Sequence, residues 1–146
     1  MAGKTKIAIA SDHGGYDLKE ALKKLFADKY EWLDLGTDSP ASCNYADFGH
    51  ALSEAVLDKK AERGIAICGS GIGISMAANR HKGIRAALCT DMTMARLSRL
   101  HNDANVLVLG GRIIGLSVAA DCVEAFMATA YEGGRHMERV QKIDAI

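Results

Sequence analysis

Short apolar runs alternate with amphipathic segments along the whole chain. The runs are the length of buried strands, and they lie at residues 6–10, 32–35, 64–67, 84–89 and 105–109. Between them, apolar side chains recur at helical spacing, as over residues 18–26. Mostly apolar strands that alternate with helices are typical of a parallel sheet covered on both faces. The pattern therefore predicts an α/β fold, a three-layer Rossmann-like or flavodoxin-like sandwich with a five-stranded parallel sheet.

The composition narrows the class of protein. The chain has 146 residues and zero formal net charge, which suits one domain over residues 1–146 and gives no field to attract nucleic acid or an anionic membrane. No apolar run is long enough to span a bilayer, and the basic start of the chain does not resemble a signal peptide. The four cysteines lack disulfide-framework or zinc-finger spacing. We expect a reduced, cytoplasmic protein without a metal site or cofactor.

A glycine-rich loop follows the third predicted strand. Residues 68–73 read Cys-Gly-Ser-Gly-Ile-Gly and lead into a predicted helix at 74–79. A turn between a strand and a helix directs several backbone N–H groups at one point, which suits an anion. Cys68 stands at the edge of this anion site, with Gly69, Gly71 and Gly73 as its candidate amide donors. A thiol beside an oxyanion site indicates an active site.

Known loop motifs do not fit these residues. A Walker loop needs a lysine that is absent, and a dinucleotide fingerprint counted from Gly69 or Gly71 meets Ile74 or Met76. A cysteine phosphatase needs an arginine at position 74, and Ser75 lies too far into the helix for a nucleophile elbow. The remaining interpretation is a thiol beside an anion site, which fits enolate or enediolate chemistry.

Other polar residues gather at predicted strand ends. Asp12 and His13 follow the first strand, Ser70 the third and Arg112 the fifth. Ligands bind at this carboxyl edge in such sheets. His101 instead precedes a strand, which places it at the opposite edge of the sheet. From there it reaches this subunit's pocket only by an unusual path of the chain, or it serves the pocket of a neighbouring subunit.

The segment after the last predicted helix is polar and contains Arg135 and Arg139. These two arginines are i,i+4 neighbours that suit anion capture, or else a solvated helix face. Packing on a second subunit is another role for this tail. Structural interpretations also remain open for the cysteines. Cys68 could be a small core residue, and Cys43, Cys89 and Cys122 are expected to serve packing alone.

Five stretches together resemble the type B ribose-5-phosphate isomerases, a group that includes galactose-6-phosphate and allose-6-phosphate isomerases. The resemblance spans nearly the whole chain, in family order, and rests on residues 11–15, 68–79, 83–86, 101–105 and 132–136. It implies a metal-free aldose–ketose isomerase that interconverts ribose 5-phosphate and ribulose 5-phosphate without a cofactor. It also implies a homodimer or homotetramer with pockets built from two subunits, the C-terminal helix packing on the partner.

The resemblance assigns a role to each candidate residue. Cys68 is the base between C2 and C1, Ser70 assists proton transfer at the sugar oxygens, and the amides of the glycine loop hold the enediolate. His101 opens the furanose ring, with Asp12 nearby. The remaining sugar contacts are Asn102 and Tyr45, and the phosphate ligands are His13, Arg112, Arg135 and Arg139, with His136 close to them.

One loop departs from the family pattern. Where relatives commonly have Asp-Tyr-Pro, this chain reads Asn-Tyr-Ala at residues 44–46, which bears on substrate length. Some relatives use a later glutamate as base, but that position here is Ile74. Three alternatives stay open: a six-carbon sugar-phosphate isomerase of the same family, a non-catalytic phosphosugar-binding module, and a cysteine hydrolase that pairs Cys68 with His101.

Overall fold

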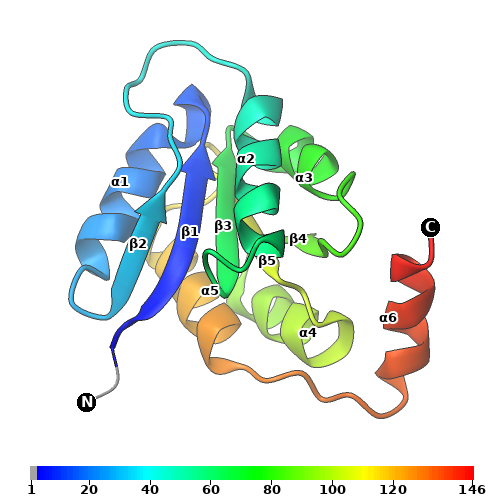
Figure 1. The fold of residues 1–146 in the computed structure, drawn as a ribbon. Coiled ribbons are helices and arrows are strands. Elements are labelled where there is room, and N and C mark those ends of the chain that lie inside the picture. The colour runs from blue at the N-terminus through cyan, green and yellow to red at the C-terminus, as the bar shows by residue number, and fades with distance from the viewer. Residues whose placement is uncertain (1–2) are drawn as a thin grey trace.

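Five parallel strands form a single sheet in the order β2-β1-β3-β5-β4, with helices on both faces (Figure 1). The computed structural model describes residues 3–146. The strands are β1 (Thr5–Ser11), β2 (Tyr30–Asp34), β3 (Arg63–Cys68), β4 (Ala86–Leu88) and β5 (Val106–Gly110). The helices are α1 (Tyr16–Leu25), α2 (Tyr45–Leu57), α3 (Ile72–Ala78), α4 (Met92–Asn102), α5 (Leu116–Ala128) and α6 (His136–Asp144), with a 3-10 turn η1 (His13–Gly15). The predicted fold class is confirmed.

The two faces of the sheet differ in side-chain size. Ile7 and Ile9 of β1 pack in one core with α1 and α5, whereas Ala8 and Ala10 pack in the other with α2 and α3. Small residues on the second face let α2 approach closely: a Cβ on Gly64 of β3 would lie 2.9 Å from Leu52. Because neighbouring residues of a strand point to opposite faces, each strand serves both cores, which explains its apolar sequence.

The strand order places the loops that matter for function. β2 and β3 lie on opposite sides of β1, so the chain switches direction between β1 and β3. Such a switch opens a crevice at the carboxyl ends of the strands. β5 lies next to β3, and Gly111 N–H donates to the Cys68 carbonyl at 2.8 Å. The loops after β1, β3 and β5 therefore meet at one edge.

The fourth strand is shorter than predicted. The apolar run covers residues 84–89, but the ladder with β5 contains only Ala86–Leu88. The Arg85 N–H donates instead to the Asn105 side chain at 2.8 Å, and the Ile84 N–H donates to the His81 carbonyl. These side-chain and turn bonds replace the ladder at the start of β4.

Helix α6 stands beside the body of the molecule, joined to α5 by an extended segment (Figure 1). The Glu132 N–H donates to the Leu100 carbonyl at the end of α4, and Arg85 pairs with Asp144 at 2.9 Å. Val140 is buried, while Met137 and Ile143 are about half exposed. The predicted packing of this helix on a partner subunit concerns a second chain and stays a prediction.

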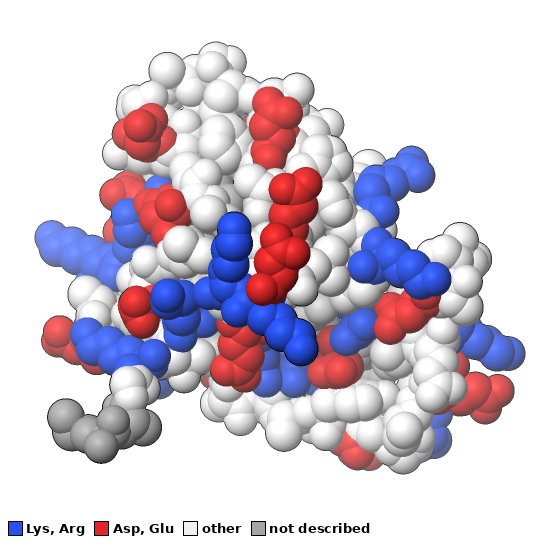
Figure 2. All heavy atoms as spheres, viewed as in Figure 1, with Lys and Arg blue, Asp and Glu red and all other residues white. Residues whose placement is uncertain are grey.

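Acidic and basic side chains are interspersed over the face in Figure 2, as the zero net charge suggests. Fewer of them lie at the end of the molecule that contains the carboxyl ends of the strands. Among residues 3–146, no helix has the length and apolar character needed to cross a membrane.

Candidate active site

Cys68 is the last residue of β3 and is 4% exposed. Its Sγ accepts a hydrogen bond from the Gly71 N–H at 3.2 Å. Gly71 has φ +81°, a left-handed conformation that favours glycine, and a Cβ there would lie 2.5 Å from the Leu88 side chain. The turn therefore depends on glycine, and it aims a backbone donor at the sulfur. A donor in this position stabilises negative charge on the sulfur.

Three loops touch through their backbones at the carboxyl edge. A Cβ on Gly14 would lie 2.9 Å from the Gly69 nitrogen, and one on Gly111 would lie 2.6 Å from the Gly14 carbonyl oxygen. The Arg112 N–H also donates to the Gly69 carbonyl at 2.9 Å. These contacts bring the loops after β1, β3 and β5 within one site.

A pocket of about 590 Å³ opens over this junction. It is lined by Asp12, Tyr45, Cys68, Gly69, Ser70, Ile72, Gly73, Met76, Arg112 and Ile113. Most of these are predicted site residues. Asp12, Ser70 and Arg112 of the group predicted at the carboxyl edge line the pocket with Cys68, whereas His13 is not among the lining residues. Ile72, Met76 and Ile113 were not predicted. The sequence could have indicated them only as apolar residues close to a functional loop. All three side chains are at least half exposed.

Asp12 and His13 are held by backbone hydrogen bonds. The Asp12 carboxylate accepts from the N–H groups of Gly14 and Gly15 at 2.9 and 3.2 Å, which caps η1. His13 Nδ1 lies 4.0 Å from the same carboxylate and accepts from the Cys43 N–H at 3.2 Å. A neutral ring that accepts at Nδ1 has its hydrogen on Nε2, so His13 retains a donor for an anion.

Ser70 belongs to the glycine loop, and Tyr45 packs against the end of that loop. Ser70 Oγ accepts from the Ile72 N–H at 3.1 Å, which leaves its own hydrogen to donate. Tyr45 begins α2 and packs on Gly73, where a Cβ would lie 2.5 Å from the ring. Asn44, at the loop that departs from the family pattern, caps α2 by accepting from the Ala46 N–H at 2.9 Å. The altered loop still presents Tyr45 to the pocket.

The other predicted residues form a second group at the opposite edge of the sheet. His101 and Asn102 end α4, which runs against the strands, and Arg135 and Arg139 belong to the start of α6. None of the residues lining the Cys68 pocket comes from this group. The position of His101 confirms the prediction from its place before β5. Among residues 3–146 of one chain, the two groups therefore do not share the Cys68 pocket.

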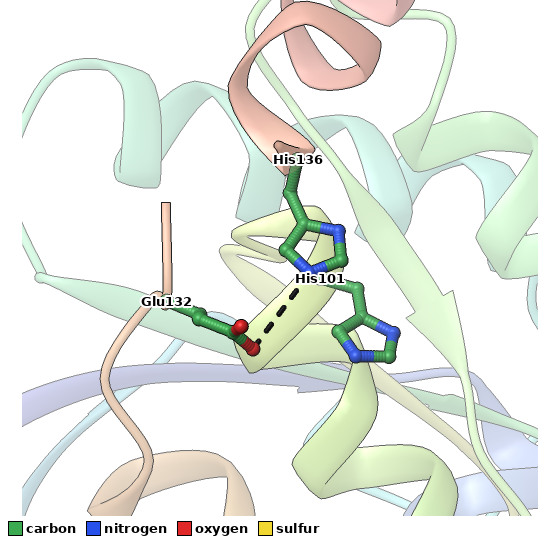
Figure 3. Close-up of side chains that lie close together, drawn as sticks. All are labelled: His101, Glu132 and His136. Carbon is green, nitrogen blue, oxygen red and sulfur yellow. Dashed lines mark ion pairs between the residues drawn. The ribbon is translucent and has the colours of Figure 1, made fainter. Parts of the chain in front are cut away.

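Two histidines and a glutamate lie together in the second group (Figure 3). The rings of His101 and His136 stack with centroids 4.4 Å apart and 20° between their planes. His136 Nε2 lies 3.7 Å from a Glu132 carboxylate oxygen, and the other oxygen pairs with Arg135 at 3.3 Å. Burial lowers the pKa of His136, and the charges of Arg135 and His101 add to this effect. Glu132 was not a predicted site residue, although it lies in the motif that contains Arg135.

The remaining cysteines lie outside the pocket. Burial raises the pKa of Cys89 to about 12 and that of Cys122 to about 11. Both thiols are therefore neutral packing groups at physiological pH, as predicted. Cys43 is partly exposed, and its N–H orients His13.

Known proteins of similar sequence and structure identify the family. A family model described as ribose/galactose isomerase matches residues 7–143. Ribose-5-phosphate isomerase B of Escherichia coli is 44% identical over 97% of this chain and 95% of its own length. A putative sugar phosphate isomerase of Bacillus subtilis is 42% identical over 94% of each chain.

Two solved structures agree with this result. The chain superposes on ribose-5-phosphate isomerase B of Clostridium thermocellum with a TM-score of 0.95 at 50% identity, covering 97% and 96% of the two chains. The ribose 5-phosphate isomerase of Thermotoga maritima gives a TM-score of 0.96 at 48% identity, covering 99% and 100%. The chain therefore belongs to the ribose/galactose isomerase family, and it is a sugar-phosphate isomerase.

Proposed function

We propose that this enzyme interconverts ribose 5-phosphate and ribulose 5-phosphate through an enediolate, with Cys68 as the base. The observation that supports this most directly is the environment of Cys68. The thiol ends β3 at the switch point of the sheet, accepts a hydrogen bond from Gly71, and lines a pocket with Asp12 and Arg112. The similar proteins of Escherichia coli and Clostridium thermocellum have names that specify the same five-carbon substrate.

The isomerisation requires three proton movements. The Cys68 thiolate removes the proton from C2 of the open-chain aldose, the C–H electron pair forms the C1–C2 double bond, and the carbonyl oxygen O1 takes the negative charge. A proton then moves from the O2 hydroxyl to O1, and Cys68 returns its proton to C1, which yields the ketose. Ser70 can relay the proton between the oxygens, because its hydroxyl hydrogen is free to donate. The amides of the glycine loop stabilise the enediolate charge.

The partner subunit would supply the rest of the pocket. His101, for ring opening, and Arg135 and Arg139, for the phosphate, lie at the opposite edge of this chain, so in a homodimer they would act in the partner's pocket. Asn102 and His136 belong to the same group. An enediolate also requires exclusion of water, and the pocket of one chain is bordered by the exposed side chains of Ile72, Met76 and Ile113. A partner that covers this apolar border would close the pocket and complete it.

His13 and Arg112 would be the phosphate ligands from the chain that provides Cys68. The Arg112 guanidinium lies close to Gly69, where a Cβ would be 3.3 Å from its Nη1. His13 has a free Nε2 donor, as described above. Asp12 is held at the same edge by two amides and would contact the sugar near the ring oxygen. The substrate would therefore extend between cationic groups of both subunits.

Cys68→Ala tests the proposal, with Cys43→Ala as the matched control, since Cys43 is a partly exposed thiol outside the pocket lining. We expect Cys68→Ala to lose at least about 10²-fold in turnover of ribose 5-phosphate, the usual contribution of an acid–base group. Binding of inorganic phosphate should be nearly unchanged. Full activity in Cys68→Ala would refute the mechanism.

A panel of aldose phosphates distinguishes the alternative substrates. Preference for allose or galactose 6-phosphate would assign the enzyme to six-carbon sugars. Exchange of the C2 proton with deuterated solvent during turnover tests the enediolate directly. A covalent acyl or phosphoryl enzyme trapped at Cys68 would instead support the hydrolase, in which the thiol is a nucleophile.

A further inference from the structure

The cluster of His101, Glu132 and His136 combines two imidazoles with one carboxylate. Each residue offers one ligand atom, and these atoms lie within 4.8 Å of one another. The three side chains come from α4, the segment before α6, and the first residue of α6, and they converge as Figure 3 shows. This composition matches the two-histidine, one-glutamate ligand set of some zinc sites.

His136 provides a second observation that points to a ligand. The residue is only 6% exposed, and its Nε2 is buried without a hydrogen-bond partner among the described residues. The nearest carboxylate oxygen, of Glu132, is 3.7 Å away and so outside hydrogen-bond distance. Buried polar atoms nearly always have a partner, and this nitrogen points toward the carboxylate across a gap. An ion between the two groups would satisfy both.

The distances suit a small divalent ion after limited adjustment. Ligand bonds of about 2.0–2.1 Å place tetrahedral zinc ligands about 3.3 Å apart, close to the distance between His136 and Glu132. The nearly parallel rings do not direct their lone pairs to one point, so His101 must turn about its side-chain bonds. It lies at the end of α4 and is only partly buried, which leaves room for this rotation.

Arg135 is the competing cation that pairs with the cluster, and the charge of Arg139 also acts on His136. Its guanidinium pairs with one oxygen of Glu132 and leaves the other oxygen facing His136. The Arg135 side chain is 68% exposed, so it can move into solvent when an ion binds. Its charge weakens the affinity for a cation but leaves the ligand set intact.

We propose that His101, Glu132 and His136 form a binding site for Zn²⁺, with a fourth position open to water or substrate. Binding of the ion requires only these three side chains. Its effect on catalysis rests on the proposed function: a nitrogen of His101 bonded to Zn²⁺ can no longer exchange a proton with the sugar, so the ion inhibits the reaction that begins from the closed ring.

Equilibrium dialysis against Zn²⁺ tests the site in the full-length protein. We expect His136→Gln and Glu132→Gln to bind the ion at least about tenfold more weakly than the wild type. His50→Gln is the control, because His50 is a histidine that hydrogen-bonds to His81 in a pair separate from this cluster. Circular dichroism shows whether either variant is misfolded. If one of them is, the other still tests the site. Equal binding by the wild type and both variants, or no binding by the wild type, would overturn the site.

Activity with and without Zn²⁺ separates the site from the proposed function. Inhibition of the wild type that a chelator reverses, and that is weaker in Glu132→Gln than in His50→Gln, supports both. Zinc binding that depends on His136 but leaves turnover unchanged supports the site and overturns the ring-opening role of His101. If His136→Gln and Glu132→Gln are inhibited at the same zinc concentration as the wild type, the site is overturned, because the ion then acts elsewhere.

Discussion

The ion pair between Arg85 and Asp144 ties the end of α6 to the rest of the molecule. Arg85 Nη1 donates to both oxygens of Asp144, at 2.9 and 3.2 Å. The same guanidinium donates through Nε to the carbonyls of Asn102 and Asp103 at the end of α4. Since α6 otherwise has few contacts with the body of the chain, we expect Asp144 to control how firmly this helix docks.

Asp144→Asn keeps the shape of the side chain and removes its charge. Hydrogen bonds to charged groups contribute about 1.5–3 kcal/mol. The Asp144 side chain is 34% exposed, so screening by solvent reduces this contribution to about 1–1.4 kcal/mol. Such a loss corresponds to a roughly fivefold to tenfold increase in the population of molecules with α6 detached. The remaining bonds of Arg85 should keep α4 and β4 in place.

Hydrogen–deuterium exchange followed by mass spectrometry measures this effect. Amides of α6 should exchange roughly fivefold to tenfold faster in Asp144→Asn, with α5 unchanged. Glu138→Gln is the control on the same helix, because Glu138 and its partner Lys142 are about 80% exposed and 3.9 Å apart. Wild-type exchange in α6 would refute the docking role.

Other outcomes follow from the same geometry. His101→Asn should reduce turnover of ribose 5-phosphate about 10²-fold but preserve exchange of the C1 protons of ribulose 5-phosphate, which is acyclic; equal loss of both would contradict a ring-opening role. Iodoacetamide at pH 8 should modify Cys68 well before Cys89, because the pKa of about 12 leaves only about one Cys89 thiol in 10⁴ ionised. A bound sugar phosphate should protect Cys68 from the reagent, and peptide mapping checks the order of modification. Burial acts to raise the pKa of Asp34, but hydrogen bonds from two lysines, the fully buried Lys19 among them, outweigh it and hold that pKa below its usual value. The ion pair thus stabilises the fold above about pH 4 and loses its effect as pH falls through the lowered pKa. In urea titrations, Asp34→Asn should therefore lower the free energy of unfolding by about 1–3 kcal/mol at pH 7 and by much less at pH 3. A loss of the same size at both pH values would exclude the ion pair as the cause.

Local sequence was enough to predict the glycine loop as a site. The apolar run that ends at Cys68, followed by alternating glycines, specifies a buried strand, a tight turn and a helix within a few residues. These elements depend on short-range sterics and burial, and the structure places Cys68 at the end of β3 as expected. The opposite-edge position of His101 was equally predictable, because a helix that precedes a parallel strand must end where that strand begins.

The border of the pocket was not predictable in this way. Ile72 begins α3 after β3, whereas Ile113 lies in the loop after β5, and each alone looks like an ordinary surface residue. Their common location shows only when β5 lies beside β3. The contact of Glu132 with His136 is similar, since Glu132 lies in the irregular segment before α6 and only the approach of α4 adds the second imidazole.

The sequence by itself determined the class of fold, the five strands, the position of Cys68 at the end of the third strand and the family. The strands and the glycine turn depend on residues that are neighbours in the sequence, through side-chain alternation and turn geometry. The family is recognised from the order of motifs along the chain. The tertiary structure decided the strand order, which brings Arg112 to Gly69, and the separation of Cys68 from His101 on opposite edges of the sheet. Strand order depends on how helices of different bulk pack over both faces, an energy summed over distant residues that no local pattern contains.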